Sequence, residues 1–344
     1  MHLPRYALGA FDVHRRQITF DYWDSDTGRV QRGRVIACRE VFRSWLDRFA
    51  RCGEVMFAVA GCTGWRFVVE ELRRAGIQAH LAEPADAATA RGPKRRAKTD
   101  RADAQHLREL LAQGRLPESW IPPEQVLEMR TTLELFKDLR EEHTAWVQRL
   151  HATLFHQGVP AVAGDVLASA QRHQLETGAG LSPAAHQAVM TTLRVLDGLD
   201  AELVVLRRQI TTFARRQPGC RALQQQYGVG PITAAAIWAQ LGDTRRFSAS
   251  RKAVRHTGLD VTVYSSDGKR TPGHLSRQGS PTLRWALFEA GKCAAHPSNP
   301  DYDYYTRVKD RCGDNRAALS MARTIARPSH HILRALGDPA LAPV

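Results

Sequence analysis

Residues 54–81 carry alternating strand and helix signals, and this order constrains the fold more than any other segment of the chain. Residues 54–60 form a mostly apolar run typical of a buried strand, and residues 77–81 predict another strand. Between them lie a loop over residues 61–65 and a helix over residues 67–75, which Gly76 ends. Strand and helix periods that alternate in this way predict an α/β domain with a partly parallel sheet.

The residues before this unit predict a β-hairpin and a helix. Residues 6–13 are mostly apolar, residues 14–16 form a polar turn, and residues 17–23 alternate as a half-exposed strand does. A turn follows at residues 24–28, and residues 40–50 place apolar side chains on one helical face. Pro122 and Pro123 form a helix-stopping linker. We therefore expect the α/β domain to span residues 1–123.

Two long stretches with heptad spacing follow this domain. Together they predict two amphipathic helices, joined through residues 158–182, that form a coiled-coil arm over residues 124–217. The pattern leaves open whether the helices pack as a hairpin within one chain or whether the arm dimerises. The first apolar seam comprises Val126, Met129, Leu133, Phe136, Val147, Leu150 and Leu154. The second comprises Leu196, Leu199, Leu203, Leu206, Ile210 and Phe213.

A mainly helical third domain is expected over residues 218–344. Gly228 and Gly230 lie in a turn that leads into a helix, and such a turn exposes backbone N–H groups that can bind phosphate. This turn resembles the helix-hairpin-helix element of non-specific DNA binders, and a helical corner without a ligand is the alternative. Residues 258–280 predict a loop, and helices are expected again at 281–295 and 317–336.

The net charge of +14 favours a polyanionic partner, and nucleic acid before membrane. No apolar run approaches the length of a transmembrane helix, no signal-peptide core is present, and the six cysteines form no C-x-x-C pair. We therefore expect a cytoplasmic protein without a membrane partner. Basic clusters and glycine turns are expected to contact the nucleic-acid backbone. For the first cluster, which comprises the six basic residues between Arg91 and Arg101, a solvated loop is the alternative. The residues of these clusters and turns are Arg91, Lys94, Arg95, Arg96, Lys98, Arg101, Gly228, Gly230, Arg245, Arg246, Arg251, Lys252, Lys269, Arg270 and Arg277.

Two carboxylates follow the first basic cluster directly. Asp100 and Asp103 are three residues apart at the start of a predicted helix, so they share a helical face. Asp12 lies near the end of the first strand, and carboxylates that converge are the ligands that Mg²⁺ prefers. The pair therefore predicts a divalent metal beside nucleic acid. The alternative is a capping Asp in a solvated charge run.

The order of these motifs resembles the DEDD transposases of the insertion-sequence-110 family over nearly the whole chain. The resemblance implies a ribonuclease-H-like, Holliday-junction-resolvase-like catalytic domain, a coiled-coil arm and a C-terminal transposase domain with a nucleophilic serine. The matching motifs are Asp12 in its strand, Gly61-Cys62-Thr63-Gly64-Trp65, Lys98-Thr99-Asp100-Arg101-Ala102-Asp103, Tyr227-Gly228-Val229-Gly230-Pro231, Arg246-Phe247-Ser248, Thr257-Gly258-Leu259 and Leu275-Ser276-Arg277-Gln278-Gly279.

The same resemblance implies roles for individual residues and partners. Asp12, Asp100 and Asp103 would hold Mg²⁺, and Ser266 would be the nucleophile, with Ser265 as the alternative. A structured bridge RNA would pair with donor and target double-stranded DNA, and dimers would assemble into tetramers. Such a protein would be nucleoid-associated in a bacterial cytoplasm. Serine attack would give a covalent 5′-phosphoserine intermediate before strand exchange and religation.

The chain departs from the family pattern at Ala60, where the family has a Glu. A methyl group cannot bind a cation, so only three carboxylates remain for the site. We expect an impaired enzyme, and we favour a substitution over a naturally impaired protein because every other motif element is intact. Two alternatives stay open: a metal-dependent Holliday-junction-type endonuclease that hydrolyses with water, and an inactive nucleic-acid-binding protein.

Overall fold

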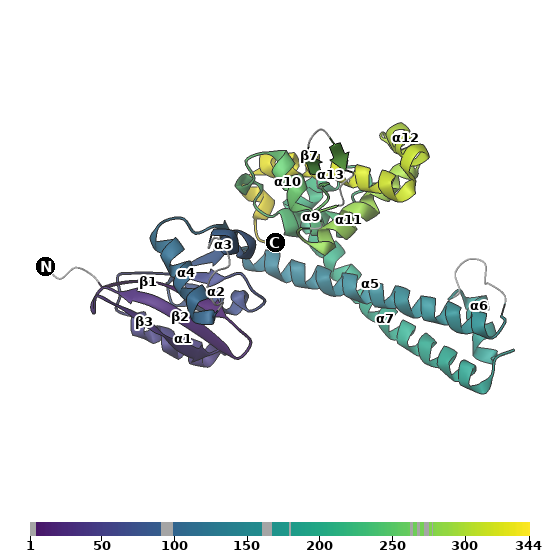
Figure 1. Cartoon of the computed structure of the whole chain (residues 1–344). Coiled ribbons are helices and arrows are strands. Elements are labelled where there is room, and N and C mark those ends of the chain that lie inside the picture. Colours follow the sequence, from purple (N-terminus) through teal and green to yellow (C-terminus); the bar gives the residue numbers. More distant parts are fainter. Residues whose placement is uncertain are drawn as a thin grey trace. The chain divides into compact units, whose positions relative to one another are not determined.

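The computed structural model describes residues 5–90, 99–159, 167–178, 180–261, 264–266, 269–271, 275–276 and 278–344. The chain divides into two compact units, Met1–Ile121 and Pro122–Val344, and Figure 1 labels the longer helices and some strands of both. No helix among the described residues is long and apolar enough to cross a membrane.

The N-terminal unit is built on a mixed sheet. In its described part, the strand order is β3-β2-β1-β4-β5-β6, and β6 pairs antiparallel with β5 at one edge. β1 runs antiparallel to β2 and parallel to β4, and β4 runs parallel to β5. The predicted hairpin and the predicted parallel pair are therefore confirmed. The strands are β1(Tyr6–Val13), β2(Gln17–Asp24), β3(Arg29–Ile36), β4(Glu54–Ala60), β5(Gln78–Ala82) and β6(Glu118–Ser119).

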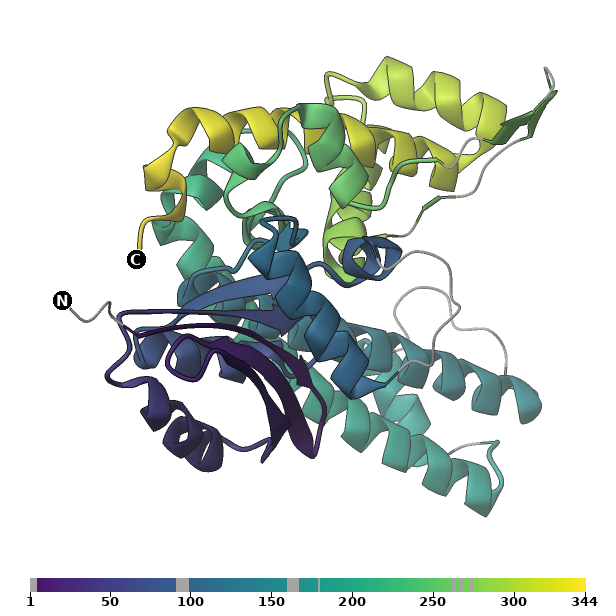
Figure 2. The same ribbon diagram turned by 60° about the vertical axis from the view of Figure 1, so that its left-hand side comes forward.

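Helices cover both faces of this sheet, as Figures 1 and 2 show for α1 and α4. Strand side chains alternate between the faces, so Phe11 and Phe57 pack toward α1, whereas Ala10 and Ala58 pack toward α4. These small alanine side chains let α4 lie close to β1, the strand that carries Asp12. The helices are α1(Arg39–Leu46), α2(Trp65–Arg74), α3(Pro84–Ala90) and α4(Asp100–Ala112), with the 3₁₀ turn η1(Asp47–Phe49).

The second unit begins with two long helices, α5(Glu124–His156) and α7(Pro183–Arg216), which pack side by side. The short helix α6(Ser169–Thr177) packs against α7 between them in the chain. Every apolar seam residue predicted in α5 is buried except Val147, which is partly buried. In α7, Leu196, Leu206 and Ile210 are buried, whereas the other three seam residues are only partly buried.

The rest of the second unit is helical apart from one small hairpin. Helix α9 is buried on all sides, and Gly291 lets α11 approach α13 so closely that an added Cβ would lie 2.4 Å from the Ala318 carbonyl oxygen. The segment predicted as a loop contains two short strands. The elements are α8(Pro218–Leu223), α9(Pro231–Leu241), η2(Thr244–Arg246), α10(Ser250–His256), β7(Tyr264–Ser266), β8(Lys269–Thr271), α11(Pro281–Lys292), η3(Cys293–Ala295), α12(Tyr302–Cys312), α13(Asp314–Leu336) and η4(Asp338–Leu341).

Candidate functional site

The acidic site forms where the end of β1 meets the start of α4. The Nε2 atom of His14 lies 3.1 Å from Oδ2 of Asp12 and 3.3 Å from Oδ1 of Asp100. The second oxygen of Asp100 accepts a hydrogen bond from the Gln17 amide at 3.2 Å. One donor atom from each of Asp12, His14 and Asp100 lies within 4.8 Å of the other two. The fold therefore brings together two carboxylates that were predicted as metal ligands, Asp12 and Asp100, and one histidine, His14, that was not.

Local sequence explains why these side chains converge. His14 lies just after the end of β1, two residues from Asp12, and its imidazole turns back to contact that carboxylate. Helix α4 is capped by Thr99, whose hydroxyl accepts the Ala102 N–H at 3.2 Å. The interpretation of Asp100 as the helix cap is therefore wrong, and both acidic residues lie in the first turn of the helix.

A buried ion pair fixes α4 against the sheet. Asp21 in β2 is fully buried and bonds the Arg32 guanidinium at 2.6 Å and the Arg108 guanidinium through its other oxygen. Arg108 lies five residues after Asp103, on the same helix. Both oxygens of Asp21 have a cationic donor, and one of these donors comes from α4. This bond holds α4, and with it Asp100 and Asp103, against the sheet.

Burial raises the pKa of the Asp12 carboxyl above its ordinary value. His14 opposes this shift through its charge and its hydrogen bond, whereas the charges of Asp103 and Asp100 reinforce it. The negative charges of Asp100 and Asp103 therefore reach the Asp12 carboxylate, which is only 8% exposed. A divalent cation would relieve this repulsion, and the donor set of carboxylate oxygens with one imidazole fits Mg²⁺ or Mn²⁺.

Ala60 lies at the level of Asp12 on the neighbouring strand. The parallel register pairs Ala10 with Ala58 and Phe11 with Val59, so Ala60, the last residue of β4, follows one step later. Its methyl group packs beside the alanine cluster on the α4 face, which is also the face of Asp12. A carboxylate at this position would point toward the acidic site, and the alanine leaves β4 without a ligand there.

The structure divides the predicted basic residues into three groups. Arg101 is exposed in the first turn of α4, and Arg251 and Lys252 are exposed on α10. Arg245 pairs with Asp243 and with Asp338 at 2.9 and 2.8 Å, and Arg246 donates to the Leu241 carbonyl at 3.2 Å. The remaining five residues of the first cluster lie outside the described residues, as does Arg277: Arg91, Lys94, Arg95, Arg96 and Lys98.

The serine segment and the glycine turn lie in the second unit. Ser266 ends β7 and pairs in register with Lys269 of β8, and Arg270 faces Ser265 in the same ladder. Gly228 adopts a φ of +79°, and an added Cβ would meet the Ala290 carbonyl oxygen at 2.9 Å, so the turn itself requires glycine. Gly230 is the exposed N-cap of α9, and Pro231 removes the first N–H donor of that helix.

Comparisons with known proteins match both units. A transposase profile, DEDD_Tnp_IS110, matches residues 10–156, and the profile described as "Transposase IS116/IS110/IS902 family" matches residues 220–306. A family 20 transposase of Pseudomonas aeruginosa is 24% identical over 306 residues, which cover 85% of this chain and 88% of the relative. The transposase of element IS1328 from Yersinia enterocolitica is 25% identical over 270 residues, covering 76% and 77%.

A third relative, the transposase of element IS1111A from Coxiella burnetii, is 24% identical over 236 residues, covering 65% of this chain and 64% of the relative. An α/β unit with converging carboxylates, followed by a helical unit with its own matching profile, defines an insertion-sequence transposase. The chain belongs to the IS116/IS110/IS902 family of these proteins. Membership implies recombination chemistry on DNA, and the carboxylates of a DEDD domain suggest a divalent metal.

Proposed function

We propose that this transposase is an RNA-guided recombinase that cuts and rejoins donor and target DNA through a covalent serine intermediate. The observation that carries the proposal is the convergence of Asp12 and Asp100 on His14 at the carboxyl end of the central strand. The sheet order, with β1 between its antiparallel neighbour β2 and its parallel neighbour β4, supports a ribonuclease-H-like catalytic domain over residues 1–123. The arm would span residues 124–217 and the serine domain residues 218–344.

The chemistry requires the acidic residues and the serine to act on one phosphodiester. Mg²⁺ held by Asp12, Asp100 and Asp103 would offset the negative charge that develops on the phosphate oxygens. The Ser266 hydroxyl loses its proton to a base, its oxygen bonds to phosphorus, and the P–O3′ bond breaks, so that O3′ takes up a proton and leaves as a 3′-hydroxyl. Attack by a 3′-hydroxyl of the other DNA reverses these bond changes and frees the serine.

Ala60 is expected to limit this reaction, because β4 supplies a methyl group where the family resemblance implies a glutamate. The test is Ala60→Glu, which should raise recombination strongly over the unaltered chain. Ala60→Gln is the matched control, since glutamine is similar in size to glutamate but carries no charge. Equal recombination by all three proteins would show that position 60 does not limit the chemistry.

The covalent step is tested by trapping protein–DNA adducts. In an Ala60→Glu background, Ser266→Ala should abolish the adduct, whereas Ser265→Ala should retain it. An adduct that survives Ser266→Ala and disappears with Ser265→Ala would move the assignment to Ser265. Cleavage without any adduct would favour the alternative, a metal-dependent Holliday-junction-type endonuclease, and binding without cleavage would favour an inactive nucleic-acid-binding protein.

Guidance by a bridge RNA and assembly into dimers and tetramers complete the proposal. Base pairing would supply sequence choice, and the exposed basic side chains of Arg101, Arg251 and Lys252 would then need only to contact phosphates. Sequencing the RNA that co-purifies with the protein tests guidance directly. A discrete structured species would support it, and random fragments would count against it. Light scattering of the purified complex measures the number of subunits.

A further inference from the structure

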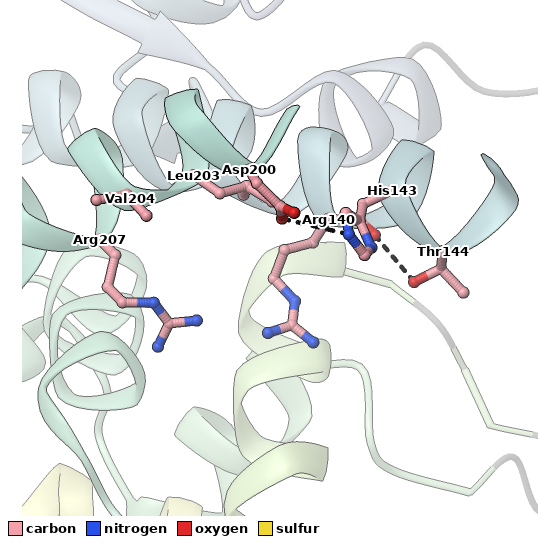
Figure 3. A pocket seen from close by; sticks show the side chains of 7 residues that line it. All are labelled: Arg140, His143, Thr144, Asp200, Leu203, Val204 and Arg207. Carbon is pink, nitrogen blue, oxygen red and sulfur yellow. Dashed lines mark hydrogen bonds and ion pairs between the residues drawn. The ribbon is translucent and has the colours of Figure 1, made fainter. Parts of the chain in front are cut away.

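A groove between the two long helices carries two arginines for which the acidic site has no use. It has a volume of about 300 Å³ and opens at Val204, which is 66% exposed. Figure 3 shows Arg140 of α5 and Arg207 of α7 leaving their helices in the same direction, toward one space. The lining residues are Arg140, His143, Thr144, Asp200, Leu203, Val204 and Arg207.

Each of the two guanidinium groups lies near an aromatic ring. The Cζ atom of Arg207 lies 5.6 Å from the ring centre of buried Phe136, and that of Arg140 lies 5.9 Å from the ring centre of Trp285. The two rings also contact each other, with centres 6.2 Å apart. A guanidinium over a ring keeps its N–H donors available at its edge, so these ring contacts leave the donors of both arginines available to a ligand.

The charges in the groove favour an anion. Neither Arg140 nor Arg207 forms an ion pair with a described carboxylate. The acidic side chain in the lining is Asp200. Its Oδ1 atom lies 3.2 Å from Nε2 of His143, so this contact links α7 to α5. Two arginines therefore present positive charge to the open groove, beside apolar carbon atoms of Leu203 and Val204.

We propose that this groove binds the phosphodiester backbone of a nucleic-acid strand, with Arg140 and Arg207 as a two-point phosphate clamp. Planar guanidinium groups match phosphate oxygens in geometry and charge, and contacts of this kind position a strand without reading its bases. DNA and RNA share this chemistry, so the experiment has one arm for each. The proposal rests on the nucleic acid that the proposed function requires, but binding tests it without any cleavage step.

The experiment measures the salt dependence of binding for three forms of the chain. The groove variant is Arg140→Gln with Arg207→Gln. The matched control is Arg149→Gln with Arg194→Gln, which removes the same charge from exposed arginines of the same two helices outside the groove. Arg149 also lies over an aromatic ring, with its Cζ 4.6 Å from the ring centre of Trp146. Each protein is titrated with a short duplex DNA and with a single-stranded RNA of equal length.

The clamp predicts a defined change in slope. Affinity falls as salt rises, and each lost phosphate contact reduces the steepness of log affinity against log salt by about 0.9 for duplex DNA and about 0.7 for a single strand. Two lost contacts thus weaken duplex binding about 30-fold at about 0.15 M salt. The nucleic acid whose salt dependence becomes less steep in the groove variant, but not in the control, is the ligand. Equal slopes for the groove variant and the control with both nucleic acids would overturn the proposal.

Hydrogen exchange of the unaltered protein provides a second test if the groove variant fails to fold. Binding of the same DNA or RNA should protect the backbone amides around Arg140 and Arg207 more than those around Arg149 and Arg194. Protection that spares the groove would refute the clamp. If the clamp is confirmed but no serine–DNA adduct forms, only the covalent mechanism is rejected. The phosphate clamp and the proposed function can therefore fail separately.

Discussion

Removing the guanidinium of Arg108 should loosen α4 and, with it, the acidic site. Arg108 is buried apart from 13% of its side chain, and it bonds one oxygen of Asp21, a carboxylate with no exposed surface. In Arg108→Ala this oxygen loses its donor inside the core, while Arg32 still serves the other oxygen at 2.6 Å. Breaking a buried pair costs about 3–5 kcal/mol, and the remaining arginine reduces the expected loss to about 2–3 kcal/mol.

Hydrogen exchange of β1 and β2 amides measures this loss as the free energy of opening of the N-terminal unit. Arg101→Ala is the matched control, because Arg101 is an exposed arginine on the same helix and should change the opening free energy by less than about 0.5 kcal/mol. The double change Asp21→Asn with Arg108→Met should recover much of the loss, since it removes the unpaired charge. A loss for Arg108→Ala no larger than that of the control would refute the reasoning.

Three further predictions follow from other contacts. If His14 binds the metal with Asp12 and Asp100, Mn²⁺ electron-spin-echo spectra should show ¹⁴N modulation that His14→Gln abolishes and His80→Gln retains; modulation that persists would place the imidazole elsewhere. Arg43, Arg39 and Arg74 lower the pKa of buried Glu71 to about 2. Glu71→Gln should therefore lower the free energy of unfolding by about 1–2 kcal/mol at pH 7, and by progressively less as pH falls from about 5 to 2. Urea titrations measure this loss, and a loss that does not change with pH would contradict the prediction. Gly291→Ala should lower the melting temperature by crowding Ala318, at a cost of about 1–3 kcal/mol, and an unchanged melting curve would show that α11 and α13 can separate.

Periodicity in the sequence predicts the elements whose side chains are buried. The hairpin of β1 and β2 and the β4–α2–β5 unit carry clear apolar patterns, and the structure confirms them. Strand β3 has no such pattern, because five of the residues in Arg29–Ile36 are polar or glycine and its pairing with β2 defines it. The partial exposure of Leu199 and Leu203 likewise reflects where α7 packs, which heptad spacing does not encode.

The candidate site was partly predictable from local spacing. Asp100 and Asp103 share a helical turn, as their spacing predicts, but Thr99 rather than an aspartate caps that helix. His14 escaped prediction because it lies in the turn just after β1, where the period of the strand no longer fixes the direction of a side chain. The meeting of Asp12 with Asp100 depends on α4 packing across β1, a contact between segments far apart in the chain that local patterns do not specify.

Divalent-cation binding by the acidic site is the most direct test of the account. Mn²⁺ titration followed by electron spin resonance should reveal a site that weakens strongly in Asp12→Asn and in Asp100→Asn, because each change removes one charged ligand. Asp26→Asn, at an exposed carboxylate in the turn after β2, should bind as the unaltered protein does. Equal Mn²⁺ affinity in all four proteins would contradict the assignment of this cluster as the metal site of the transposase.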